Sequence, residues 1–309
     1  MKIIFFGNTS FGVPTLEKLN ESKIEIAAVV TNNDFSKKRK KKSKTSIKSW
    51  AEQNSINLIQ QDNLNDIDFI ENLKSFNADF FIVIAYKILP KKIFSIPKLG
   101  TMNLHGSLLP KYRGAAPIQR SILNGDKVTG VSTFIIDKNI DTGNIILQSE
   151  LLVKDKNFGQ IHSELSEKGA KLIMNSIDHI IDKKPLVMQK GDYTYAPKIK
   201  KEETQINWKS RSINVINQIR AFSPRPGAFS YLNSKRLRIY DAVEFLDSEH
   251  WLEPGDVFVL NKKRLLIGTI DSPVEIKQLQ LEGKNVMDAS NFINGYKNLL
   301  EDESKLKKR

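Results

Sequence analysis

Asn103 and His105 are two polar side chains, two positions apart, at the end of an apolar run. The chain then enters a turn-rich stretch, and residues 103–119 read NLHGSLLPKYRGAAPIQ. Side chains of a strand alternate between its faces, so the amide and the imidazole would lie side by side while Leu104 faces the other way. Such a pair can donate hydrogen bonds to a ligand and move a proton. A lone histidine is more often structural. The pair and the glycine turn after it raise the case for a ligand site until the two interpretations are about equally supported.

A second loop, Asp137–Gly143 (DKNIDTG), could bring a carboxylate to the same place. It joins two predicted strands, and the returning chain would put Asp141 beside His105. A carboxylate there would orient the imidazole and favour its charged form. The alternative is a plain turn residue, because Asp-Thr-Gly is ordinary turn chemistry. A single copy of this tripeptide disfavours an aspartic protease, and metal binding by Asp137 and Asp141 is disfavoured because further ligands are lacking.

The first half of the chain alternates apolar strand-like runs with helical periodicity, which predicts a doubly wound, Rossmann-like α/β domain. In such a sheet ligands bind at the carboxyl ends of the strands, where Asn103 and His105 would lie. Gly7–Gly12 (GNTSFG) lacks the spacing of a dinucleotide loop and is interpreted as the first strand-to-helix turn. The predicted strands are Lys2–Phe6, Ile24–Thr31, Ile56–Ile59, Asp79–Ala85 and Leu99–His105, and the predicted helices are Phe11–Leu19, Ile47–Gln53 and Asp66–Phe76.

After Leu123 the pattern changes. The predicted elements here are helices at Ala115–Leu123, Phe158–Ile181 and Ser212–Ala221, and strands at Val131–Ile136 and Asn144–Val153. Residues 189–204 are polar and without period, which predicts a linker. Beyond residue 226, five short β-type runs at turn spacing indicate a small β-barrel of the oligonucleotide-binding type. We therefore expect a first domain at 1–188, which contains the polar pair. A linker at 189–204 and a C-terminal β-barrel domain at 205–309 follow it.

Composition narrows the class of protein. The 309 residues include no cysteine, which excludes disulfides, thiolate catalysis and zinc-thiolate sites. No window approaches the ~20 apolar residues of a membrane helix, and the N-terminal run is too short for a signal peptide, so we expect a cytoplasmic protein without a membrane partner.

The net charge is +13, and residues 37–44 read KKRKKKSK. This favours a polyanionic partner such as nucleic acid, although a compositional bias or a solvated loop would also produce such a run.

The stretch 103–119 closely resembles the signature of the 10-formyltetrahydrofolate-dependent formyltransferases. The resemblance implies that Asn103, His105 and Asp141 form the catalytic set. It also implies that the segment S-L-L-P forms the folate-binding loop, with the residues Ser107, Leu108, Leu109 and Pro110. The co-substrate would be 10-formyltetrahydrofolate, and no metal is needed.

Further segments resemble the members of that family that formylate initiator methionyl-tRNA. With these segments included, the resemblance extends from residue 1 to about residue 296. These segments are Tyr195–Ile199, Ile206–Trp208, Ile219–Pro224 and Leu279–Lys284. In those members a basic loop meets the acceptor end of the tRNA, which assigns tRNA contacts to Arg39, Lys40, Lys41 and Lys42. The family usually has Gly and Pro around this arginine, where this chain has Phe35, Ser36, Lys38 and Lys40.

The resemblance implies that the C-terminal barrel binds the tRNA backbone, with candidates Lys209, Arg220, Arg225, Lys235, Arg236 and Arg238. The expected enzyme is a monomer that formylates the methionine of initiator tRNA. Three alternatives stay open: a formyltransferase for an amino-sugar nucleotide, a hydrolase that deformylates the folate, and a non-catalytic RNA-binding protein with a decayed enzyme fold. The basic loop and the tRNA-type segments disfavour the first two, and the intact polar set disfavours the third.

Overall fold

The computed structural model describes residues 1–34, 44–246 and 251–300, and the chain divides into two compact units. The first unit contains Met1–Pro117, Val128–Leu152 and His162–Ala196. The second contains Ile118–Lys127, Val153–Ile161 and the chain from Pro197 onward. The two short inserts in the second unit come from the part of the sequence that precedes the predicted linker.

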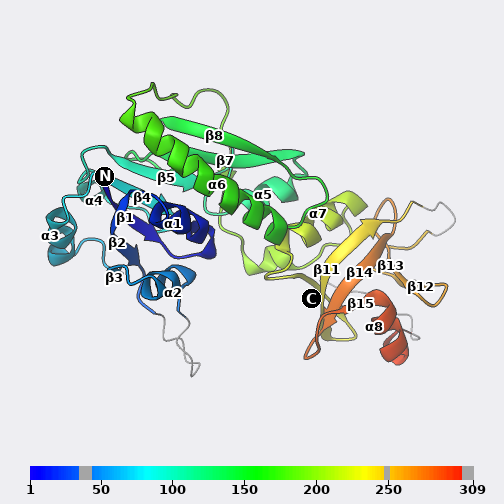
Figure 1. Ribbon diagram of the computed structural model, residues 1–309. Helices are drawn as coiled ribbons and strands as arrows, with labels where there is room; N and C mark the ends of the chain where they lie inside the picture. The colour runs from blue at the N-terminus through cyan, green and yellow to red at the C-terminus, as the bar shows by residue number, and fades with distance from the viewer. Residues whose placement is uncertain (35–43, 247–250, 301–309) are drawn as a thin grey trace. The chain divides into compact units, whose positions relative to one another are not determined.

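The first unit is built on a seven-stranded sheet in the order β3-β2-β1-β4-β5-β7-β8 (Figure 1). The strands are β1 (Lys2–Gly7), β2 (Glu25–Thr31), β3 (Leu58–Gln60), β4 (Phe80–Ile84), β5 (Thr101–His105), β7 (Val128–Ile135) and β8 (Ile145–Leu152). The first five in this order are parallel, as predicted, and β7 and β8 extend the sheet in antiparallel fashion. This confirms the Rossmann-like α/β class.

The helices of the first unit begin and end close to the predicted positions. They are α1 (Val13–Asn20), α2 (Ser46–Gln53), α3 (Ile67–Ser75), α4 (Lys91–Phe94) and α6 (Phe158–Ile181), of which α6 belongs to this unit from His162 on. Asp66 caps α3, since its side chain accepts a hydrogen bond from the Phe69 N–H at 2.8 Å. Helix α4 was not predicted, because one helical turn carries no period to detect.

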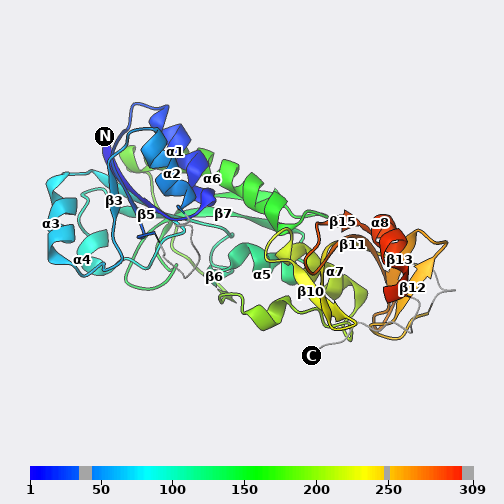
Figure 2. The ribbon, with the colours of Figure 1, turned by 90° about the horizontal axis from the view of Figure 1, so that it is seen from below.

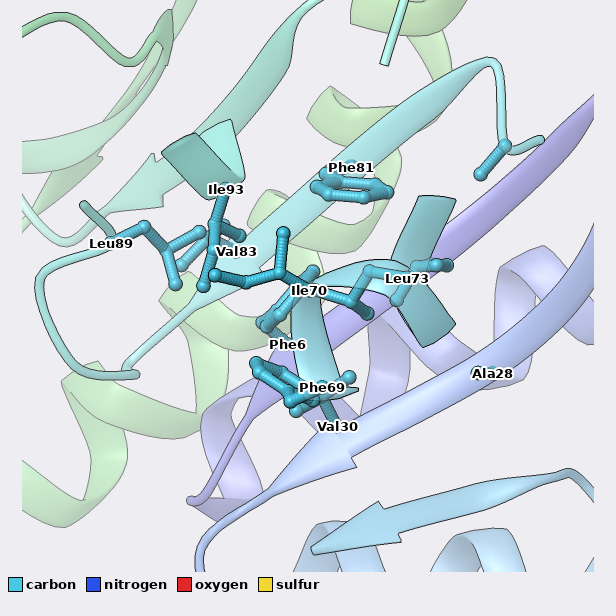
Figure 3. Packing of buried hydrophobic residues seen from close by; sticks show 12 residues of the cluster. Phe6, Ala28, Val30, Phe69, Ile70, Leu73, Phe81, Val83, Leu89 and Ile93 are labelled. Carbon is cyan, nitrogen blue, oxygen red and sulfur yellow. The ribbon is translucent and has the colours of Figure 1, made fainter. Parts of the chain in front are cut away.

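One face of the sheet packs against α3 and α4 (Figure 3). Phe6 of β1 and Phe81 of β4 lie on this face, and their ring centroids are 5.2 Å apart. Phe69 and Leu73 of α3 and Ile93 of α4 complete the cluster. Full burial of such a side chain stabilises the fold by about 1.5–3 kcal/mol. Every second side chain of the strands therefore packs on α3 and α4 and holds these helices against the sheet.

The opposite face of the sheet sets the orientation of the polar pair. A Cβ atom added at Gly169 of α6 would lie 2.5 Å from the Leu104 side chain, so Leu104 packs closely on α6. Alternation along β5 then turns Asn103 and His105 toward the face away from α6. The predicted alternation of Leu104 against this pair is confirmed.

The second unit contains a six-stranded antiparallel sheet, in which β10-β11-β14-β13-β12 are successive neighbours and β15 pairs with β14. Its strands are β10 (Ala228–Leu232), β11 (Lys235–Glu244), β12 (Val257–Leu260), β13 (Arg264–Ile267), β14 (Val274–Leu281) and β15 (Met287–Asp288). The helices are α7 (Ser212–Phe222), α8 (Ala289–Gly295) and most of α5 (Pro117–Leu123). All five strands predicted for a barrel form in this sheet, whereas β15 and α8 were not predicted.

The segment 189–204, predicted as a linker, contains regular structure. Strand β9 (Tyr195–Ala196) pairs in parallel with β6 (Arg113–Gly114), and η2 (Lys201–Thr204) is a 3-10 turn. Two-residue strands have no period, so sequence patterns miss them. This pairing bears directly on the site, because β6 is the next strand after β5, which ends at His105. Both strands are labelled in Figure 2. In the ranges that the structure describes, no helix has the length and apolarity needed to cross a membrane.

Candidate active site

His105 is buried at the end of β5, with 6% of its surface exposed. Its Nε2 lies 2.8 Å from the main-chain oxygen of Tyr112, a hydrogen-bonding distance. Its Nδ1 lies 3.7 Å from Oδ2 of Asp141, which is within ion-pair range but too long for a hydrogen bond. The ring is therefore fixed through Nε2, and Nδ1 is the nitrogen left to interact with a bound molecule.

Asn103 lies two positions before His105 on the same side of β5. It is partly exposed, and its side-chain amide makes no hydrogen bond with any residue in the described ranges. An amide kept near the core without a partner loses hydrogen-bond energy unless water or a ligand supplies one. Asn103 thus offers two unused N–H donors beside the imidazole.

Asp141 reaches His105 from the loop between β7 and β8, as the sequence predicts. Its Oδ2 accepts a hydrogen bond from the Gly114 N–H at 2.8 Å, and its own backbone is left-handed at φ 55°. A Cβ atom at Gly143 would overlap the main-chain oxygen of Ile135, so glycine is needed there for close approach. The tight Asp-Thr-Gly turn is therefore what places the Asp141 carboxylate beside His105.

Gln189 connects the loop that contains Asp141 to the segment that follows His105, a role that no sequence motif predicts. Its Oε1 accepts hydrogen bonds from Nε and Nη2 of Arg113 at 3.1 and 2.7 Å. Its Nε2 donates to the main-chain oxygens of Asp141 and Gly143 at 3.0 and 2.8 Å. The loop of Asp141 and the strand after His105 are thus connected through one side chain.

Thr194 fixes the segment that holds His105. Its Oγ1 accepts a hydrogen bond from the Tyr112 N–H at 2.8 Å, and its main-chain oxygen accepts from the Arg113 N–H at 2.9 Å. Since Tyr112 provides the oxygen that binds Nε2 of His105, residues of the predicted linker support the imidazole. The only sequence signal for this role was the resemblance of the neighbouring Tyr195–Ile199 segment.

The loop Ser107–Pro110 is held rigidly beside β7. The buried Ser107 hydroxyl donates to the Lys111 main-chain oxygen at 2.6 Å. The Leu109 N–H donates to Oγ of Ser132 at 3.0 Å, and Gln148 donates to the Leu109 oxygen at 2.9 Å. A loop whose backbone is fixed in this way is preorganised for a ligand.

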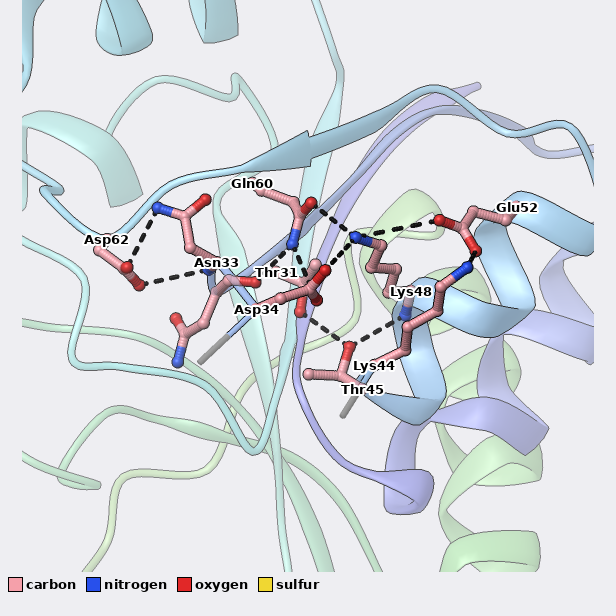
Figure 4. Close-up of polar contacts among 10 residues, drawn as sticks. Thr31, Asn33, Asp34, Lys44, Thr45, Lys48, Glu52, Gln60 and Asp62 are labelled. Atoms are coloured by element: carbon pink, nitrogen blue, oxygen red, sulfur yellow. Dashed lines mark hydrogen bonds and ion pairs between the residues drawn. The ribbon is translucent and has the colours of Figure 1, made fainter. Parts of the chain in front are cut away.

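The predicted tRNA residues Arg39, Lys40, Lys41 and Lys42 lie outside the described residues. The residues on both sides of this segment are joined by an ion-pair network (Figure 4). Lys48 is nearly buried, and its Nζ lies 2.6 Å from Oδ2 of Asp34 and 2.9 Å from Oε1 of Gln60. Lys44 pairs with Glu52 at 2.7 Å. Hydrogen bonds and ion pairs therefore hold in place the described residues on both sides of this segment.

Arg220, one of the predicted RNA-binding residues, is instead bound within the protein. Its guanidinium donates to the main-chain oxygens of Lys154 and Lys156, and burial lowers its pKa. Arg236 is partly used as well, because its guanidinium lies 5.0 Å from the Phe229 ring centroid. The exposed candidates are Lys209, Arg225 and Lys235.

Comparison with known proteins identifies the class. Residues 1–177 match the formyl transferase family, and residues 198–297 match the C-terminal domain of formyl transferases. The chain belongs to the formyl transferase family. A curated relative from Thermodesulfovibrio yellowstonii, named methionyl-tRNA formyltransferase, is 44% identical over 302 residues and 96% of both chains. A relative of the same name from Chlorobium limicola is 38% identical over 312 residues, again with 96% of both chains covered.

Solved structures share the fold. A methionyl-tRNA formyltransferase from Clostridium thermocellum aligns with a TM-score of 0.55 and 23% identity, covering 79% of this chain and 94% of that one. HypX from Aquifex aeolicus in complex with tetrahydrofolic acid aligns with a TM-score of 0.67 and 16% identity, covering 98% of this chain and 48% of that one. The sugar 3N-formyl transferase WlaRD aligns with a TM-score of 0.66 and 22% identity, covering 92% of this chain and 99% of that one.

Proposed function

We propose that the chain transfers the formyl group of 10-formyltetrahydrofolate to the α-amino group of the methionine on initiator methionyl-tRNA. The observation that carries this proposal is the Asn103 amide, which has no hydrogen-bond partner among the described residues, beside His105 and Asp141 at the end of β5. The full-length likeness to methionyl-tRNA formyltransferases supports the choice of acceptor.

The residues suit a formyl transfer. The neutral amine attacks the formyl carbon and forms a new C–N bond, while negative charge develops on the formyl oxygen. Asn103 donates an N–H to this oxygen, and His105 in its charged form donates through Nδ1, since Nε2 is bound to Tyr112. Removal of one such donor typically costs roughly 3 kcal/mol of barrier.

Collapse of the intermediate breaks the bond to the folate nitrogen. The attacking amine loses one proton, and the leaving nitrogen gains one. Asp141, 3.7 Å from Nδ1 of His105, stabilises the positive charge of the ring and keeps it oriented. A carboxylate or a water molecule carries the proton between the two nitrogens. Among the described residues no group of three or more His, Asp and Glu side chains could hold a metal ion.

The folate is proposed to bind along Ser107, Leu108, Leu109 and Pro110. The polar groups of Ser107 and Leu109 are bonded to the protein, so this loop gives a fixed shape and leaves the polar recognition of the formyl group to Asn103. That division of roles fits an aromatic co-substrate with one reactive group, because the walls of such sites are mostly apolar.

The two halves of the chain are proposed to serve the two substrates. Residues 1–188 form the formyl-transferring domain, 189–204 connect it, and 205–309 bind the tRNA. Arg39, Lys40, Lys41 and Lys42 contact the acceptor end through its phosphates. Because one chain carries both sets of residues, we propose a monomer, and because the named relatives are translation enzymes of bacteria, a cytoplasmic one.

The test follows label from the formyl group of 10-formyltetrahydrofolate with purified protein. The acceptors are free methionine and methionine charged on initiator tRNA. Label on the charged tRNA alone supports the proposal. Release of free formate indicates a hydrolase, and label on an amino-sugar nucleotide but not on the tRNA indicates the sugar formyltransferase. Absence of any transfer contradicts an enzymatic role.

A further inference from the structure

Two tyrosines beside the site are unusually exposed. Tyr193 exposes 51% of its surface and Tyr195 exposes 69%. Their ring centroids are 5.3 Å apart and the planes make an angle of 79°, so the edge of one ring meets the face of the other. Tyrosine supplies a large apolar face at a low entropic cost of ordering, which makes exposed pairs suited to binding.

Arg113 completes this group with a positive charge. Its guanidinium carbon lies 4.9 Å from the Tyr193 ring centroid. Gln189 binds Nε and Nη2, whereas Nη1 makes no hydrogen bond with any residue of the described ranges. The guanidinium is therefore held in place while one edge stays available for an anion.

The group is tied directly to the catalytic residues. Arg113 and Tyr195 are paired across β6 and β9. The residue before Arg113 provides the oxygen that binds His105, and the residue after it, Gly114, donates to Asp141. A molecule bound on Tyr195 and Arg113 would thus lie next to the groups proposed to act on the amine.

We propose that Arg113, Tyr193 and Tyr195 form a subsite for the unpaired terminal nucleotide of the acceptor RNA. The base stacks on the exposed ring of Tyr195, which Tyr193 holds in orientation, and the free edge of Arg113 binds a phosphate. Unpaired bases typically stack on aromatic faces and guanidinium planes, and the stacking itself tolerates any base because every base has a π-face. This inference rests on the proposed function, because it assumes that the amine arrives on an RNA end.

The first experiment compares Tyr195→Ala with the wild type in formylation of methionyl-tRNA. The expected result is a rise of about five- to tenfold in KM for the tRNA, the lower part of the range for one stacked base. The KM for 10-formyltetrahydrofolate stays unchanged. Tyr195→Phe, which keeps the ring, recovers most of the loss. Ile67→Ala is the matched control, since Ile67 is an equally exposed apolar side chain, at 74%, on α3.

The second experiment measures stacking without catalysis. Initiator tRNA carrying 2-aminopurine in place of its terminal adenine is titrated with the protein, and stacking on Tyr195 quenches its fluorescence. Tyr195→Ala is expected to abolish the quenching, and Arg113→Gln to weaken binding and lower its salt dependence.

The outcomes separate the two proposals. If the wild type formylates methionyl-tRNA and Tyr195→Ala changes neither KM nor quenching, the subsite is wrong and the function stands. A rise in the KM for 10-formyltetrahydrofolate alone would assign the ring to the folate and overturn the subsite. If the wild type formylates no tRNA, the proposed function fails, and the fluorescence titration still decides whether Tyr195 stacks on RNA.

Discussion

The side-chain nitrogen of Gln189 donates to the main-chain oxygen of Asp141 at 3.0 Å, across 48 positions of sequence. Through its oxygen, the same side chain binds Arg113, which stands directly before the residue that donates to the Asp141 carboxylate. Gln189 is thus a positioning residue: its described hydrogen bonds go to Arg113, Asp141 and Gly143 and not to His105 or Asn103, and they fix the loop from which Asp141 approaches His105.

Gln189→Leu keeps the size of the side chain and removes all of its hydrogen bonds. We expect kcat for methionyl-tRNA formylation to fall about tenfold, since small displacements of a catalytic group can cost up to about a hundredfold. The KM for folate should change little. Single-turnover rates measure the effect. Gln218→Leu is the control, because Gln218 also donates to two main-chain oxygens, those of Glu203 and Gln205. Equal losses of kcat in both variants would contradict a specific role for Gln189.

His105→Ala removes the imidazole from the end of β5. The turnover rate should fall by about a hundredfold or more, because a charged donor to the developing oxyanion contributes roughly 3 kcal/mol. The control is His179→Ala, in which the lost imidazole likewise contacts a main-chain oxygen, that of Pro185, at 3.0 Å. Circular dichroism checks that both variants fold. Near-wild-type turnover in folded His105→Ala would remove His105 from the catalytic set.

Gly143→Ala tests whether close packing of the loop holds Asp141 in place. The new methyl group would overlap the Ile135 main-chain oxygen, so the loop must shift, and kcat should fall by roughly ten- to a hundredfold. Gly295→Ala is the control, since a Cβ there meets no atom within 4 Å. Wild-type kcat in both variants would contradict the claim that close packing at Gly143 holds Asp141 in its working position.

The buried parallel strands were predictable because they are continuous apolar runs. The run Asp79–Ala85 became β4 (Phe80–Ile84), and the helix predicted at Phe158–Ile181 has the same bounds in the structure. The alternation of Asn103, Leu104 and His105 also followed from the strand period, because Leu104 packs on α6. Periodicity and local chemistry were sufficient for these elements, each of which spans several residues and buries at least one face.

The supports of the site were not predictable in the same way. Gln189 and Arg113 are 76 positions apart, and their contact depends on the pairing of two-residue strands. A polar stretch without period contains no local signal of such a pairing, so the sequence predicts only a linker for residues 189–204. The same limit applies to Arg220: the sequence shows its charge, but only the fold shows that its guanidinium donates to the main-chain oxygen of Lys156.

Asp271 should make the second unit sensitive to acid. Burial opposes ionisation of this carboxyl, but hydrogen bonds from Ser212, Arg211, Thr269 and Ser272 outweigh it and hold its pKa well below the ordinary value of about 3.8. Because the folded pKa lies below the unfolded one, the stabilisation is full above about pH 3.8 and is lost as the pH falls toward the folded pKa.

Asp271→Asn should therefore lower the free energy of unfolding at pH 7 by roughly 1–3 kcal/mol. The difference from the wild type should shrink as the pH falls below about 3.8. Urea unfolding at a series of pH values measures it. Asp241→Asn, an exposed carboxylate on β11, is the control and should change stability by less than about 0.5 kcal/mol. A difference that stays constant with pH would contradict the assignment to ionisation.

The basic segment is expected to bind the tRNA through charge. Each phosphate contact changes the slope of log affinity against log salt by about 0.7–0.9, so replacing Lys40, Lys41 and Lys42 with alanine should flatten that slope by roughly two units. Filter binding of initiator tRNA over a range of salt concentrations measures it. Replacement of the exposed residues Lys23, Lys74 and Lys98 removes the same net charge and serves as the control. If the two triple variants flatten the slope equally, the effect belongs to overall charge; if only the first does, the segment itself contacts the phosphates.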